Sequence, residues 1–173
     1  ENGDAARAVQ EIRRAVELND SSGQLRSELA GTLFRAGRVS QAEEEAREAY
    51  CIIHSAITEK VGFLRNGQKG CSPDSLLDAN GMLEIKTKLP HLMIECLLRD
   101  EFPSEHKAQC QGALWVAERE WIDIAVYWPR LPLFVKRAYR DEVYIKKLSD
   151  AVDEFNFELN EVVQRIRGYA EAA

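Results

Sequence analysis

The apolar residues of this chain change their spacing near residue 57. Before that point they recur at helical intervals, and after it several short runs are alternating or continuously apolar, as in β-strands. The predicted helices cover residues 4–19, 24–36, 41–57, 90–99, 104–118 and 140–168, and the predicted strands cover 59–65, 82–88, 121–128 and 133–139. This order predicts an α/β fold, in which helices flank a small mixed central β-sheet.

The chain length predicts one domain with a buried core, because 173 residues fit a single domain. Residues 1–40 are expected to form a helical N-terminal part, and residues 41–173 the mixed core with a long C-terminal helix. Asp4 and Ser40 are expected to cap the first and third helices, since each precedes an apolar-periodic run.

Composition limits the classes of protein to consider. The apolar runs fall short of the roughly 20 residues that span a membrane, so no membrane partner is expected. Four cysteines without a CxxC pair indicate reduced thiols and a cytoplasmic location. A net charge of −6 counts against a general nucleic-acid binder. It does not count against a nuclease, whose metal-holding pocket is itself acidic.

The stretch GCSPDSLLDANGMLEIKTK, residues 70–88, carries the strongest sign of chemistry. Glu84 and Lys86 occupy alternate positions of a strand and therefore share one face. Residues 76–81 are expected to form a loop that returns the chain and places Asp74 beside Glu84. Two carboxylates and a backbone carbonyl are ligands that Mg²⁺ accepts, and a neighbouring lysine suits phosphodiester hydrolysis.

An exposed edge strand with an ordinary Glu–Lys pair is the alternative. Acid-x-Lys triplets are common, so the spacing alone favours this simpler interpretation.

Several further blocks follow one another in a fixed order. They are EEEAREAY (43–50), VGFLRNGQKGCSPDSL (61–76), GMLEIKTK (81–88), HKAQCQGALWV (106–116), YWPRLP (127–132) and VKRAYRDEVYIKKL (135–148). Together they resemble the lambda-exonuclease family, the phage-type alkaline exonucleases and YqaJ-like viral recombinases of the PD-(D/E)xK nuclease fold. The resemblance runs from Glu43 to about Ile166. RAGRVSQA (35–42) also resembles the family's motif that grips a 5′-phosphate.

The resemblance implies a role for particular residues. Asp74, Glu84, Lys86, Glu43 and Gln109 match catalytic positions of the family. Asp74, Glu84, Glu43 and the carbonyl of Ile85 match its ligands for Mg²⁺, for which Mn²⁺ can substitute. Arg35 and Ser40 match the DNA-gripping motif. Arg137 and Arg140 belong to the densest basic stretch of the chain, which is either a solvated face or a contact with DNA phosphates.

The family also implies a function. It is Mg²⁺-dependent, 5′-to-3′ digestion of linear double-stranded DNA in phage-type recombination, in the cytoplasm of a bacterial or phage-infected cell. A ring-shaped homotrimer and a single-strand annealing partner are further expectations. Two alternatives stay open: a restriction-type endonuclease on the same fold, and a catalytically inactive DNA- or protein-binding module.

Some residues lie outside or depart from the matched motifs. Ser75 stands where the family has glycine, and serine would be strained if that position required φ > 0. Arg47 is expected to pair with a carboxylate, and His106 to face the catalytic pocket. The three tryptophans are expected to pack in the core: Trp115, Trp121 and Trp128.

Overall fold

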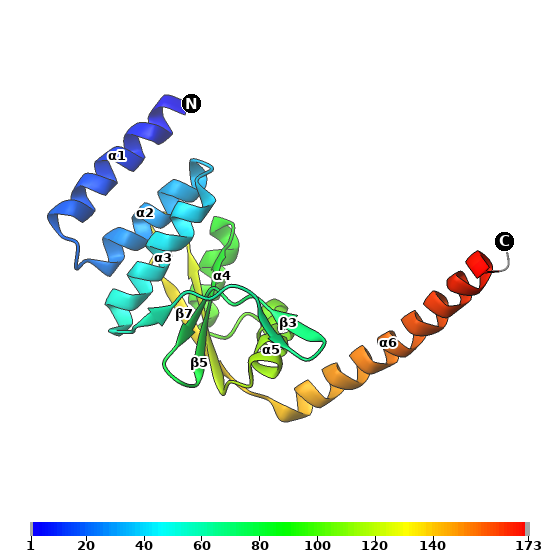
Figure 1. The fold of residues 1–173 in the computed structure, drawn as a ribbon. Helices are drawn as coiled ribbons and strands as arrows, with labels where there is room; N and C mark the ends of the chain where they lie inside the picture. Colours follow the sequence, from blue (N-terminus) through cyan, green and yellow to red (C-terminus); the bar gives the residue numbers. More distant parts are fainter. Residues whose placement is uncertain (1, 172–173) are drawn as a thin grey trace.

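A computed structural model describes residues 2–171 (Figure 1). The helices are α1 (Asn2–Leu18), α2 (Gly23–Arg35), α3 (Val39–His54), α4 (Pro90–Arg99), the short 3-10 helix η1 (Ser104–His106), α5 (Lys107–Ala117) and α6 (Glu142–Glu171). The strands are β1 (Thr58–Glu59), β2 (Leu64–Asn66), β3 (Lys69–Cys71), β4 (Ser75–Leu77), β5 (Gly81–Thr87), β6 (Trp121–Tyr127) and β7 (Phe134–Tyr139). None of the described helices is both long and apolar enough to cross a membrane.

A five-stranded sheet with the order β1-β4-β5-β6-β7 lies at the centre of the fold. The pair β5 and β6 is parallel, and the other neighbours are antiparallel. A parallel pair needs a long crossover connection, which α4, η1 and α5 supply here. Strands β2 and β3 form a separate hairpin. The predicted α/β fold with a mixed central sheet is confirmed.

The two faces of β5 pack against different helices, because side chains alternate along a strand. Leu83 and Ile85 join the larger core cluster, which also contains Leu33 of α2 and Tyr50 of α3. Met82 points to the opposite face, where it packs with Leu114 of α5. Glu84 and Lys86 follow the alternation of Met82, so they emerge on the α5 side of the sheet. The strand therefore delivers both charged groups to one helix.

Three local predictions are wrong. Residues 59–65 are not one strand, because the chain leaves the main sheet after β1 and pairs again only within the β2–β3 hairpin. Helix α3 begins at Val39 with Arg38 as its N-cap, so Ser40 lies in the first turn; Asp4 likewise lies inside the first turn of α1.

The loop expected over 76–81 returns the chain as predicted but is shorter, because only residues 78–80 form the turn. Residues Ser75–Leu77 form β4, because they pair antiparallel with β5 in the register Ser75↔Leu83. The chain turns only after Leu77, where Asp78 adopts a positive φ of 46°. Ser75 is fully buried in this extended strand and its φ is not positive, so the serine is not strained at that position.

Gly31 provides a test of how tightly α2 packs on the loop after β6. A Cβ atom on Gly31 would lie 2.3 Å from the backbone nitrogen of Pro129, where backbone must move to make room. We expect Gly31→Ala to lower the free energy of unfolding by about 1–3 kcal/mol, the usual cost of overpacking. Urea unfolding measures this change.

Gly112→Ala is the matched control, because the nearest atom to its new Cβ is Leu148 Cδ2 at 3.6 Å. We expect this second variant to be neutral or more stable by up to about 1 kcal/mol, since alanine favours a helix interior. Equal stability of the two variants would contradict the packing of α2 against Pro129.

Candidate active site

The β4–β5 pairing brings Asp74 against the middle of β5. Asp74 directly precedes β4, and its Oδ2 accepts a hydrogen bond of 2.6 Å from the backbone N–H of Ile85. The neighbouring residue of β5, Glu84, is buried with 4% of its surface exposed. The two carboxylates that the sequence predicted to meet are therefore brought together by main-chain pairing.

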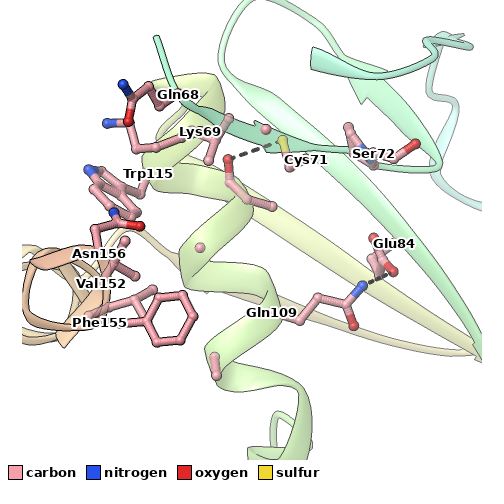
Figure 2. A pocket seen from close by; sticks show the side chains of 17 residues that line it. Gln68, Lys69, Cys71, Ser72, Glu84, Gln109, Trp115, Val152, Phe155 and Asn156 are labelled. Atoms are coloured by element: carbon pink, nitrogen blue, oxygen red, sulfur yellow. Dashed lines mark hydrogen bonds between the residues drawn. The ribbon is translucent and has the colours of Figure 1, made fainter. Parts of the chain in front are cut away.

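Glu84 receives two hydrogen bonds on one oxygen. Gln109 Nε2 donates to Glu84 Oε1 at 2.5 Å (Figure 2). Lys86 Nζ donates to the same oxygen, also at 2.5 Å. Lys86 comes from the same face of β5, and Gln109 comes from the first half of α5. Asp74, Glu84, Lys86 and Gln109 thus form one cluster, as the sequence predicted.

The surroundings of Glu84 make its carboxyl group harder to ionise than an ordinary glutamate. Burial raises the pKa of the Glu84 carboxyl, and the negative charge of Asp74 raises it further, while Lys86 and Gln109 act in the opposite direction. The net effect is a pKa above the ordinary range. A cation beside Asp74 and Glu84 would stabilise the ionised form of both groups.

Helix α3 lines a second cavity, which also borders Asp74. Ser40 and Glu43 line a cavity of about 340 Å³ together with Asp74 and Lys60. Burial raises the pKa of the Tyr127 hydroxyl, and the charges of Glu43 and Asp74 raise it further. Glu43 therefore faces the same region as Asp74.

Arg47 anchors the turn that carries Asp74. Its Nε donates to Ser75 Oγ at 2.8 Å, and its Nη2 donates to the backbone carbonyl of Asp74 at 3.4 Å. A third bond, from Nη1 to Glu44 Oε2 at 2.7 Å, confirms the predicted pairing of Arg47 with a carboxylate. The partner of Arg47 on the turn, Ser75, was not predicted. Its only signal was a polar residue at the start of an apolar run.

The donor set near Asp74 fits Mg²⁺. This ion prefers hard oxygen ligands and often takes only one or two carboxylates together with water. Asp74 and Glu84 supply two carboxylates. The Ile85 group that contacts Asp74 is its N–H, so the carbonyl of Ile85 as a ligand stays a prediction. Within residues 2–171, no three His, Cys, Asp or Glu side chains gather closely enough to hold a metal ion. Glu43 is thus not drawn into one ligand group with the other two, and its role as a ligand stays a prediction.

The four predicted DNA-contacting residues have different surroundings. Ser40 lies beside Asp74 in the cavity described above, and Arg35 is exposed at the end of α2. Arg140 donates to the backbone carbonyl of Leu114 at 2.6 Å and to Glu142. These contacts within the chain do not test whether the three residues bind DNA, so that role stays a prediction.

Arg137 has a structural partner that the sequence analysis missed. It forms two hydrogen bonds to Asp123, at 2.7 and 2.9 Å, and Asp123 is buried in the middle of β6. Tyr50 of α3 donates to the same carboxylate at 2.6 Å, and Arg137 also stacks on Trp121. The signal was present, because Asp123 is a lone acidic residue inside the apolar run WIDIAVYW.

A larger pocket of about 640 Å³ adjoins the cluster, between the β2–β3 hairpin, α5 and α6 (Figure 2). Glu84 and Gln109 lie at one end of it, and Trp115, Val152 and Phe155 line the other. Lys69 Nζ lies 4.1 Å from the ring centre of Trp115. Trp121 and Trp128 are half-buried and pack against the core, as predicted. The prediction is wrong for Trp115. Trp115 instead forms a wall of this pocket.

His106 lies just before α5, and its ring is partly buried. Its Nε2 has no hydrogen-bond partner among the described residues. Burial lowers the pKa of the imidazole, and the charges of Lys88 and Lys86 lower it further, against the opposing effect of Glu105. Lys88 and Glu105 form an ion pair beside it. His106 is not among the residues that line either cavity described above, so its place facing the catalytic pocket stays a prediction.

Comparison with known proteins identifies the class to which this fold and cluster belong. Residues 23–120, more than half of the chain, match the model of the YqaJ-like viral recombinase domain. The chain therefore belongs to this family, and the predicted family is confirmed. No curated protein sequence matches the chain.

Two solved structures are similar to most of the chain. A crystal structure of an alkaline exonuclease (LHK-Exo) from Laribacter hongkongensis shares 27% identity, with a TM-score of 0.73 over 86% of this chain and 84% of that chain. The structure of LHK-Exo in complex with dAMP gives 27% identity and a TM-score of 0.72, over 86% and 85% of the two chains.

The Arg137–Asp123 pair predicts a stability effect. Arg137→Met would leave the Asp123 carboxylate buried with Tyr50 as its remaining side-chain donor. We expect a loss of about 2–4 kcal/mol in the free energy of unfolding, because removing one partner of a buried pair leaves an uncompensated charge. Urea unfolding measures the loss.

Lys136→Met is the control for Arg137→Met. Lys136 pairs with Asp100, which is 74% exposed, and exposed pairs contribute about 0–1 kcal/mol. Similar small losses in both variants would show that Arg137 is not structural and would return it to the DNA-contacting candidates.

His106 predicts a dependence of stability on pH. Its pKa is lowered from 6.5 in the folded chain, so folding favours the neutral imidazole. This contribution is present above the unfolded pKa and is lost as the pH falls through the folded pKa. We expect the native chain to lose stability relative to His106→Gln between about pH 8 and about pH 5, the range in which histidine titrates. Urea midpoints that change in parallel over this range would contradict the burial of His106.

Proposed function

We propose that this protein is a Mg²⁺-dependent exonuclease that digests linear double-stranded DNA from its ends. The convergence of Asp74, Glu84 and Lys86 on one side of β5 carries the proposal. Membership of the YqaJ-like family and the similarity to an alkaline exonuclease structure support it.

The residues of the cluster suit phosphodiester hydrolysis. A bound Mg²⁺, for which Mn²⁺ can substitute, would supply polarisation of the phosphate and a more acidic bound water. Asp74 and Glu84 would hold the ion, with the carbonyl of Ile85 as a further donor. Lys86 would leave Glu84, orient the attacking water and stabilise the charge that develops on the phosphate.

Residues around the cluster position it. Gln109 holds Glu84 from the side of α5, and Arg47 holds the Asp74 turn from α3. Both contacts fix carboxylates that must keep their geometry during the reaction. We assign Gln109 and Arg47 to positioning the carboxylates.

The polarity of digestion follows from the DNA-gripping motif. We propose that Ser40 and Arg35 bind a 5′-phosphate, which would make the digestion 5′ to 3′. Ser40 lines the same cavity as Asp74, so a terminal phosphate at Ser40 would lie near the cleavage site. A single-strand annealing partner and a homotrimer stay predictions that no contact within the chain tests.

Digestion of linear DNA tests the proposal. We expect the native chain with Mg²⁺ to degrade a 5′-phosphorylated linear duplex and to leave closed circular DNA intact. Asp74→Asn should lower the rate by more than about 100-fold, because even residues behind metal ligands contribute 10- to 100-fold. Lys86→Met should lower it by about 10²–10⁴-fold, the range of acid–base catalysis. Glu95→Gln, an exposed carboxylate on α4, should leave the rate unchanged.

Other outcomes have definite meanings. Cleavage of the circle would identify a restriction-type endonuclease. No digestion by a chain that unfolds cooperatively would identify an inactive binding module. Faster release of a label from the 3′ end than from the 5′ end would contradict the proposed polarity.

A further inference from the structure

The α5 pocket, the cavity of about 640 Å³ between the β2–β3 hairpin, α5 and α6, has two chemically different ends. Glu84 and Gln109 of the catalytic cluster lie at one end, and the rings of Trp115 and Phe155 lie at the other (Figure 2). Glu84 and Lys69 are the only charged groups among the residues that line it. A nucleotide has the same division, because its anionic phosphate and its flat, uncharged base lie at opposite ends. The α5 pocket therefore suits a nucleotide whose phosphate lies at the cluster.

Two cavities meet at the turn that precedes β4. Ser72 and Pro73 line both the α5 pocket and the α3 cavity, the smaller cavity that contains Ser40. Asp74 borders the α3 cavity, and Glu84 borders the α5 pocket. A phosphate held at these two carboxylates through a cation therefore has one cavity on each side. Because a terminal 5′-phosphate is proposed to bind Ser40, the strand beyond the scissile phosphate would enter the α5 pocket.

The Trp115 ring offers a stacking surface at the far end of the α5 pocket. Lys69 Nζ lies 4.1 Å from the centre of this ring, and the lysine side chain is half-buried. Stacking of a base on an aromatic ring is stronger than a cation–π contact at a solvated site, so a base would displace the ammonium. A second ring, Phe155 of α6, is 61% exposed although it lines the pocket. A base against Phe155 would remove apolar surface from water.

Two amide side chains border the aromatic end, Gln68 from the β2–β3 hairpin and Asn156 from α6. An amide both donates and accepts hydrogen bonds, so it can pair with the polar edge of any base. Stacking is equally tolerant, because every base has a π face. An enzyme that removes nucleotides in succession needs a site with this tolerance.

We propose that the α5 pocket binds the base of the second nucleotide of the digested strand, the nucleotide that follows the scissile phosphate. This base would stack on Trp115 and contact Phe155. The inference rests on the proposed nuclease function, and it names the part of the substrate that lies beyond the cleaved bond. Trp115 and Phe155 would position the strand, and neither would touch the reacting atoms.

Removal of single bases from the substrate tests the proposal. When the second nucleotide of a 5′-phosphorylated linear duplex is abasic, we expect the native chain with Mg²⁺ to release the first nucleotide about tenfold more slowly, a typical loss for one stacked base. Trp115→Leu should show this loss with the normal duplex and no further loss with the abasic one, because both changes remove the same contact. An abasic first nucleotide should affect both proteins by the same factor.

Matched variants separate stacking from general damage to the fold. Comparing two substrates within one preparation cancels any difference in the folded fraction of a variant. Trp115→Phe keeps a flat ring and should keep most of the dependence on the second base. Phe155→Ala should lower this dependence. Phe157→Ala is its control, because Phe157 is 66% exposed but is not among the residues that line the α5 pocket, so it should behave as the native chain.

Binding without cleavage distinguishes failure of this inference from failure of the proposed function. The probe is a 5′-phosphorylated single-stranded oligonucleotide with Ca²⁺, which takes oxygen ligands as Mg²⁺ does. Loss of the second base should weaken binding to the native chain about tenfold and leave binding to Trp115→Leu unchanged. The bound base should also quench tryptophan fluorescence in the native chain but not in Trp115→Phe. If these results hold while no DNA is digested, the α5 pocket stands and the proposed function fails.

Three results would overturn the inference. Digestion or binding that is indifferent to the second base leaves the α5 pocket without this ligand. A loss on removal of that base that is equally large in the native chain and in Trp115→Leu places the base elsewhere. A free mononucleotide that binds as tightly as the oligonucleotide, and only when Trp115 is present, assigns the pocket to the released product.

Discussion

The hydrogen bond from the Ile85 N–H to the Asp74 carboxylate is the contact on which the candidate site depends. It fixes one carboxylate against the strand that carries the other, so the spacing of the pair is set by main-chain geometry. Arg47 secures the same turn from the opposite side, through Ser75 and the carbonyl of Asp74. A flexible loop could not hold two repelling carboxylates together in this way.

A second buried polar group, the Asp123 carboxylate, fixes the helices and strands around that contact. Asp123 binds Tyr50 of α3 and Arg137 of β7, so one carboxylate joins three elements of the fold. The residue lies on β6, directly beside β5 in the parallel pair. Charge buried at this point is satisfied on both oxygens, as a low-dielectric interior requires. The position of α3, which carries Glu43 and Ser40, thus follows from a polar contact as well as from apolar packing.

Sequence alone predicted the helices and strands whose apolar residues recur at regular spacing. It also predicted the candidate site, because the site residues lie on or beside those elements. Helix α4 and strand β5 are examples, and the meeting of Glu84 with Lys86 follows from strand alternation. It could not predict the change of pairing partner between β1 and β2, because two short segments compete there for different sheets. It also misplaced Trp115, since only the folded chain reveals a pocket beside α5.

The contacts of the site differ in the length of chain that they enclose. Asp74 and Ile85 are 11 residues apart, and Glu84 and Gln109 are 25 apart, whereas Tyr50 and Asp123 are separated by 73. The entropy lost on closing a loop grows with its length, so the β4–β5 pair can form as a local hairpin while the link from α3 to β6 requires most of the chain. The two carboxylates therefore meet through the shorter chain closure, whereas the walls of the site depend on the longer one.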